Sequence, residues 1–107
     1  MSGFSITYAT ATPESAEHGD YADTGFLVED VTFREAMDEL RWYRGAYVEA
    51  DSYAGGRPHR PRWFTFYNAD EDYSTGAVTN YSLHLPERIT DASRMRIARL
   101  LGCYGAK

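Results

Sequence analysis

The alternation of apolar and polar side chains predicts strands in two parts of the chain. Residues 4–10 alternate in this way and are rich in residues that favour strands, so we expect a strand with Phe4, Ile6 and Tyr8 on one face. A shorter run at residues 25–29 predicts a second strand. The polar residues between them, from Pro13 to Thr24, predict a loop.

Two further strands are predicted around an acidic turn. Residues 62–67 and 77–85 carry strand patterns, and residues 68–76 between them have the composition of a turn. In the second of these strands one face would carry Tyr81, Leu83 and Leu85. Residues 46–51 show a weaker strand pattern, and residues 52–61 predict a loop because Gly and Pro are concentrated there.

A capping box predicts the first helix. Thr32 can accept a hydrogen bond from the amide of Glu35, and the Glu35 carboxylate can accept one from the amide of Thr32. Apolar residues follow at helical spacing, namely Phe33, Ala36, Met37 and Leu40. With Gly45 as a C-terminal stop, the pattern predicts a helix over residues 33–44.

A second helix is predicted over residues 91–101. Thr90 stands at the N-cap position, and Ile89 before it can pack onto the first turn. Gly102 follows at the expected end. The apolar side of this helix is predicted to consist of Met95, Ile97, Ala98, Leu100 and Leu101.

The elements together predict one α+β domain spanning residues 1–107. A chain of this length fits a single domain, and the element order is β-β-α-β-β-α. Short connections favour a three- to four-stranded antiparallel sheet with both helices on one face. The predicted core consists of Phe33, Leu40, Phe64, Phe66, Leu83, Ile97 and Leu101.

Charge changes this picture because it is divided unevenly along the chain. The net charge is −5, with −8 in residues 1–51 and +3 in residues 52–107. Such a division permits an acidic face that meets a basic partner, although it also fits ordinary solubility charge. No apolar run reaches about 20 residues, and the N-terminal residues lack the features of a secretory signal, so we expect a cytoplasmic protein.

Catalytic and metal-binding chemistry finds little support in the sequence. Residues 70–81 begin like a calcium loop but have Thr75 and Tyr81 where the loop needs Gly and Glu. The three His residues are scattered, and Cys103 is the single cysteine, so we expect neither a zinc site nor a disulfide. No nucleophile motif or cofactor motif is present, and we therefore expect a non-catalytic protein without a cofactor.

An acidic loop at residues 14–30 is the leading candidate for a contact surface. Carboxylates of one sign accelerate encounters with a basic surface, and a Tyr among them can act as an anchor. The alternative is a loop whose acids are simply solvated. The candidate residues are Glu17, Asp20, Tyr21, Asp23, Glu29 and Asp30.

A basic segment that ends in an aromatic residue is the second candidate surface. It consists of Arg57, His59, Arg60, Arg62 and Trp63. Such a segment can hold phosphate or RNA. The acidic balance of the chain disfavours direct nucleic-acid binding, so a solvated loop or internal pairing with the acidic half explains these residues better.

Residues 18–26, 72–76 and 81–86 (HGDYADTGF, DYSTG and YSLHLP) resemble small uncharacterised acidic proteins carried by proteobacterial phages, plasmids and integrated elements. That group includes anti-CRISPR and antirestriction inhibitors. The resemblance implies an inhibitor that binds a CRISPR or restriction complex. The alternative is an accessory protein- or nucleic-acid-binding module without an inhibitory role. A mimic of DNA over the whole molecule is disfavoured because the second half of the chain is net basic.

Overall fold

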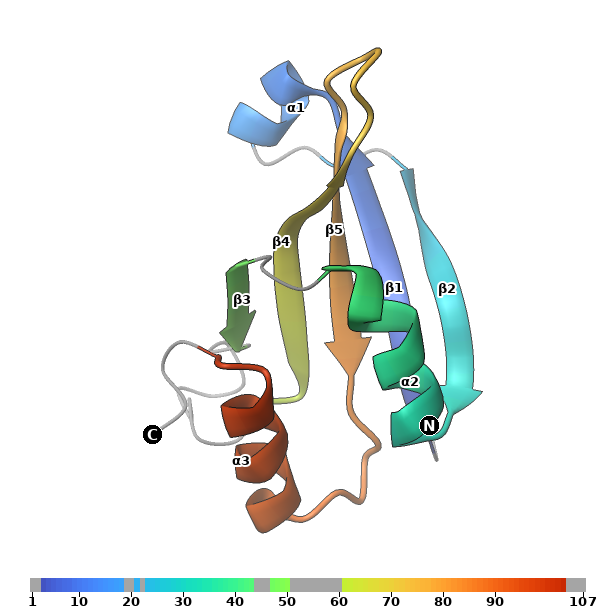
Figure 1. The fold of residues 1–107 in the computed structure, drawn as a ribbon, viewed down its shortest axis with the longest axis vertical. Coiled ribbons are helices and arrows are strands. Elements are labelled where there is room, and N and C mark those ends of the chain that lie inside the picture. The colour runs from blue at the N-terminus through green and yellow to red at the C-terminus, as the bar shows by residue number, and fades with distance from the viewer. Residues whose placement is uncertain (1–2, 19–20, 22, 44–46, 51–60, 104–107) are drawn as a thin grey trace.

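Five antiparallel strands form one sheet in the order β2-β1-β5-β4-β3 (Figure 1). The computed structural model describes residues 3–18, 21, 23–43, 47–50 and 61–103. The strands are β1 (Phe4–Ala11), β2 (Asp23–Val31), β3 (Tyr47–Ala50), β4 (Trp63–Glu71) and β5 (Val78–His84). The helices are α1 (Pro13–Glu17), α2 (Phe33–Leu40) with a 3₁₀ turn at Arg41–Tyr43, and α3 (Asp91–Leu100).

The α+β class is confirmed, whereas the predicted number and order of elements were wrong. The sheet has five strands rather than three or four, because the weak pattern at residues 46–51 does form β3. The segment 13–24 is not all loop, since it contains α1 and the start of β2. The predicted pairing of the two central strands is confirmed, with Phe64 opposite Leu83.

Helices α2 and α3 cover the same face of the sheet, as predicted (Figure 1). Ile6, Phe64 and Leu83 are fully buried between the sheet and these helices. The helices contribute mainly Ala36, Leu40, Ile97 and Ala98 to this core. Phe33 and Leu101 are only half-buried at its edge, and Leu100 is 65% exposed, so its predicted place on the apolar side of α3 was wrong.

The capping box of α2 forms as the sequence predicts. The amide of Glu35 donates to the Thr32 hydroxyl at 3.2 Å, and the amide of Thr32 donates to the Glu35 carboxylate at 3.1 Å. These bonds satisfy two amides that the first helical turn leaves without helical partners. The α-helix ends at Leu40, earlier than predicted, and continues as the 3₁₀ turn to Tyr43; Gly45 lies outside the described residues.

An irregularity in β4 extends the β4–β5 hairpin beyond the rest of the sheet. Phe66 pairs with Tyr81 and Asp70 pairs with Thr79, so β4 carries two more residues than β5 over this stretch. Asn68 takes up the extra length with a φ of 51° and donates its amide to the Asn80 side chain at 2.8 Å. The strand therefore runs through residues 68–71, which the sequence pattern assigns to a turn, and the hairpin tip reaches the end of the molecule where α1 lies (Figure 1).

Candidate protein-binding surface

Helix α1 and the tip of the β4–β5 hairpin form one end of the molecule (Figure 1). They touch through Pro13 and Gly76, because a Cβ atom added to Gly76 would lie 3.2 Å from Cγ of Pro13. Helix α1 begins where the Thr12 hydroxyl accepts the amide of Ser15 at 3.2 Å, with Pro13 at the first helical position. Two segments distant in the sequence are thus brought together at this end.

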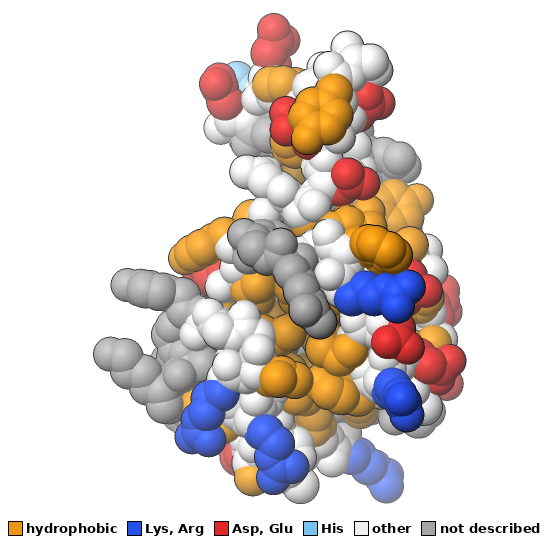
Figure 2. All heavy atoms as spheres, viewed as in Figure 1, with side chains coloured by type: hydrophobic (Ala, Val, Ile, Leu, Met, Phe, Trp, Pro, Cys, Tyr) orange, Lys and Arg blue, Asp and Glu red, His pale blue; other side chains and the backbone are white. Residues whose placement is uncertain are grey.

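This end carries carboxylates and, among the described residues, no Lys or Arg. We call it the acidic end. Its exposed acids are Glu14, Glu17, Asp70, Glu71 and Asp72. The sequence has no Lys or Arg in residues 1–33 or 63–87. Figure 2 shows red but no blue side chains at the top of the molecule, and both blue and red side chains in its lower half. The described bases are Arg34, Arg41, Arg62, Arg88, Arg94, Arg96 and Arg99.

The turn at the hairpin tip presents an aromatic side chain within the acidic end. Tyr73 is 94% exposed, the highest value among the large hydrophobic side chains described as exposed. Hydrogen bonds fix the turn beside it: the amide of Gly76 donates to the Asp72 carbonyl at 2.7 Å, and the amide of Asp72 donates to the Ala77 carbonyl at 2.8 Å. Gly76 closes the turn with a φ of 73°, a conformation that favours glycine.

The Asp72 side chain also stabilises this turn. Hydrogen bonds from the hydroxyl and then the amide of Ser74 hold the pKa of Asp72 below its ordinary value of 3.8. Asp72 is therefore ionised at neutral pH, and its charge adds to those of Asp70 and Glu71 beside Tyr73. The sequence signal for this feature is the run from Asp70 to Gly76, which we had interpreted only as an acidic turn.

The predicted acidic contact loop at residues 14–30 is not a single loop, because it contains most of α1 and of β2. Glu17 lies in α1 at the acidic end, whereas Glu29 and Asp30 lie at the far end of β2 (Figure 1). Asp20 lies outside the described residues, and for Asp23 only its backbone position at the start of β2 is described. A loop interpretation failed because the strand β2 separates these acids along its length.

Asp30 forms local hydrogen bonds, and Tyr21 is half-buried. Asp30 accepts the amide of Gly3 at 2.6 Å and donates its own amide to the Ser5 hydroxyl at 3.0 Å, with a φ of 53°. The pKa of the Tyr67 phenol is raised chiefly by burial, and then by electrostatic interaction with Glu49 and with Tyr21. Neither Asp30 nor Tyr21 belongs to the acidic end as defined above.

The second candidate surface is described only at its C-terminal part. Arg57, His59 and Arg60 lie outside the described residues. The guanidinium of Arg62 lies 5.5 Å from the ring centroid of Trp63, a cation–π contact. Trp63 precedes the buried Phe64 and therefore lies on the opposite face of the sheet, where its ring centroid is 5.8 Å from that of His84.

His84 and Cys103 show where burial affects ionisable groups. The His84 ring and the Thr7 hydroxyl share a hydrogen bond of 2.9 Å. Burial lowers the pKa of His84 below the ordinary value of 6.5. Burial raises the pKa of the Cys103 thiol to about 11, as expected of a structural cysteine. Among the described residues, no three His, Cys, Asp or Glu side chains are grouped so that they could hold a metal ion.

Comparisons with known proteins leave the family open. No family model matches the sequence, and neither the curated proteins nor the solved structures gave a match. Within the part of the chain that the structure describes, no helix is long and apolar enough to cross a membrane.

Proposed function

We propose that this protein is a non-catalytic inhibitor that binds a basic surface of a bacterial defence complex through its acidic end. The observation that carries the proposal is the gathering of carboxylates from α1 and the β4–β5 hairpin at one end of the molecule, which also carries the exposed Tyr73. The resemblance to proteins of phages and other mobile elements supplies the class of target, a CRISPR or restriction complex in the bacterial cytoplasm.

The charge distribution supports binding of a basic partner. A protein partner that approaches with a basic surface is attracted to the acidic end, where no described Lys or Arg opposes it, whereas arginines accompany the acids over the rest of the described surface. Because the carboxylates are exposed, they contribute chiefly to the association rate and to its dependence on salt.

Tyr73 supports the proposal because a binding surface needs more than charge. Interfaces depend on a few anchor residues, among which tyrosine is frequent, since a large ring can be buried while its hydroxyl keeps a partner. Tyr73 buries almost none of its surface within its own chain, so nearly all of that surface remains available to a partner. The hydrogen-bonded turn lowers the entropic cost of ordering this side chain on binding.

The proposal is tested by infection of bacterial strains that carry either a CRISPR system or a restriction system. The protein is expressed in each strain, and the plaquing efficiency of a phage that the system targets is measured. We expect the wild-type protein to restore plaquing in one of these strains. A variant with Glu14→Lys, Glu17→Lys and Tyr73→Ser should lose this effect while keeping the melting temperature of the wild type, because all three side chains are exposed.

A matched control carries the same number of charge reversals away from the acidic end. Glu29→Lys and Glu39→Lys replace exposed acids on β2 and α2, and this variant should still restore plaquing. Failure of the wild-type protein to protect phage in any of the strains would contradict the inhibitory role. Equal loss of protection in both variants would contradict the assignment to the acidic end.

A further inference from the structure

An apolar hollow lies between α2 and α3, away from the acidic end. Its volume is about 510 Å³, within the range of roughly 300–1,000 Å³ that small-molecule sites occupy. Its lining comes from β1, the first turn of α2, the segment between β5 and α3, and α3 itself. The lining residues are Phe4, Phe33, Pro86, Arg88, Ile89, Ser93, Arg96 and Ile97.

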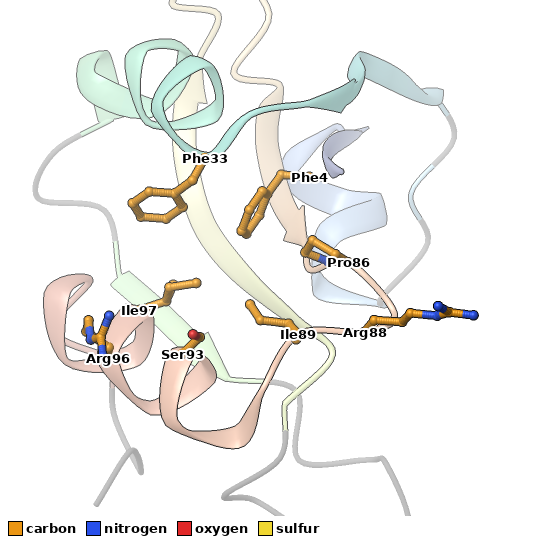
Figure 3. Close-up of a pocket in the computed structure, with 8 residues that line it drawn as sticks. All are labelled: Phe4, Phe33, Pro86, Arg88, Ile89, Ser93, Arg96 and Ile97. Atoms are coloured by element: carbon orange, nitrogen blue, oxygen red, sulfur yellow. The ribbon is translucent and has the colours of Figure 1, made fainter. Parts of the chain in front are cut away.

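The wall of the hollow is formed mainly by aromatic and aliphatic side chains. In Figure 3 Phe4 and Phe33 lie on one side, opposite Ile89 and Ile97. The two phenyl rings pack against each other with their centroids 5.3 Å apart. Phe33 is held at the first turn of α2 and Ile97 is buried in α3, so this wall is preformed by the fold.

The charged side chains among the lining residues have one sign. Arg88 and Arg96 are exposed, and neither forms an ion pair with another described residue. None of the eight lining residues is acidic. In Figure 3 the side chain of Arg88 extends outward from the rim, where its length and exposure allow it to turn toward a bound group. The hydroxyl of Ser93 is a further polar group in the lining.

We propose that this hollow binds a small amphiphile with an apolar tail and an anionic head group, for which a straight-chain carboxylate is the simplest case. The tail would occupy the space between the phenyl rings and the two isoleucines, and the carboxylate would remain at the mouth of the hollow, attracted by the positive charges of Arg88 and Arg96 on either side. Charge complementarity favours this class of ligand, because the two arginines repel a cationic head group and form weaker hydrogen bonds with a neutral one than with a carboxylate.

The test is an NMR titration of the full chain with three probes that share a ten-carbon tail. Decanoate, decyltrimethylammonium and decyl glucoside are each added below their micelle concentrations. We expect decanoate to shift the methyl signals of Ile89 and Ile97 saturably and to bind about tenfold more tightly than the cationic probe. Equal affinity for all three probes, no saturable shift with decanoate, or shifts centred on other residues would overturn the proposal.

Variants separate the head-group site from the tail site. Arg88→Glu with Arg96→Glu should weaken decanoate binding about tenfold or more, whereas Arg99→Glu, an exposed control on the same helix outside the lining, should change it by less than about threefold. Ser93→Phe should fill the hollow and abolish binding of all three probes. If this last variant does not fold, the exposed arginine variants still decide the question, and unchanged decanoate affinity in the double variant would overturn the proposal.

Discussion

The Asp72 carboxylate accepts two hydrogen bonds from Ser74, one from the hydroxyl at 2.7 Å and one from the backbone amide at 2.9 Å. The residue between them is Tyr73, whose ring is 94% exposed. These bonds stabilise the turn that holds the tyrosine at the tip of the hairpin.

Replacing Asp72 with alanine should therefore loosen this turn without unfolding the domain. We expect faster amide hydrogen exchange at Ser74 and Gly76, measured by NMR, because the acceptor for the Ser74 amide is lost. Asp72→Asn keeps an oxygen acceptor and should change exchange less. Unchanged exchange at Ser74 in the alanine variant would show that the side chain does not stabilise the turn.

The contact between Gly76 and Pro13 predicts a difference between two glycine substitutions. Both Gly76 and Gly102 have positive φ, at 73° and 63°, so each replacement by alanine carries a backbone cost of about 1 kcal/mol. A Cβ at Gly76 also meets Pro13, whereas one at Gly102 meets nothing within 4 Å. Chemical denaturation should show a larger loss for Gly76→Ala. Equal losses would mean that α1 does not pack on the turn.

His84 should make the stability depend on pH in the weakly acidic range. Burial lowers the pKa of His84 below 6.5, so the unfolded chain takes up a proton more readily than the folded one. The free energy of unfolding should be fully maintained above about pH 6.5 and should fall as the pH is lowered from there to the depressed pKa. His84→Gln should flatten this dependence in equilibrium denaturation.

The pH range separates the effect of His84 from that of the carboxylates. The pKa values of Glu35 and Asp72 lie below their ordinary values of 4.5 and 3.8. The stability that these two carboxylates contribute is therefore lost only at a pH below the range in which His84 acts. The slope near pH 6 is therefore the part of the dependence that is assigned to His84. The explanation would be wrong if His84→Gln kept that slope.

The degree of burial predicts an order of stability losses among three leucines. Leu83 has no exposed surface, so Leu83→Ala should cost about 2–5 kcal/mol through lost burial and the cavity that remains. Leu101 is half-buried, so Leu101→Ala should lower the free energy of unfolding by less than Leu83→Ala does. Leu100 is 65% exposed, and its replacement should stay within about 0.5 kcal/mol. A different order in urea denaturation would contradict the packing of α3 described above.

Local sequence signals predicted the elements whose stabilising contacts are local. The capping box at Thr32 and Glu35 depends on residues three apart, so the sequence was sufficient to place the start of α2. The same holds for Thr90, which caps α3 through the amide of Ser93. Alternation in residues 4–10 likewise placed Ile6 on one strand face with Phe4 and Tyr8, although the predicted core omitted Ile6, which the structure buries completely.

Strands whose length depends on pairing with segments distant in the sequence were predicted too short. Strand β2 runs from Asp23 to Val31 because it pairs with β1 over that length, although only residues 25–29 carry a strand pattern. Strand β4 continues to Glu71 because Asp70 and Glu71 pair with β5. Backbone pairing overrides a turn-like composition when the partner strand is already in place.

The sequence by itself determined that the chain is acidic, with its excess negative charge in the first half and no base before residue 34. Only the tertiary structure decided which acids share a surface. Strand β2 carries Glu29 and Asp30 away from Glu17, while the β4–β5 hairpin brings Asp70, Glu71 and Asp72 to the end where α1 lies. The physical reason is that strand pairing fixes the distances between segments far apart in the chain, and these distances determine which charged side chains lie close together.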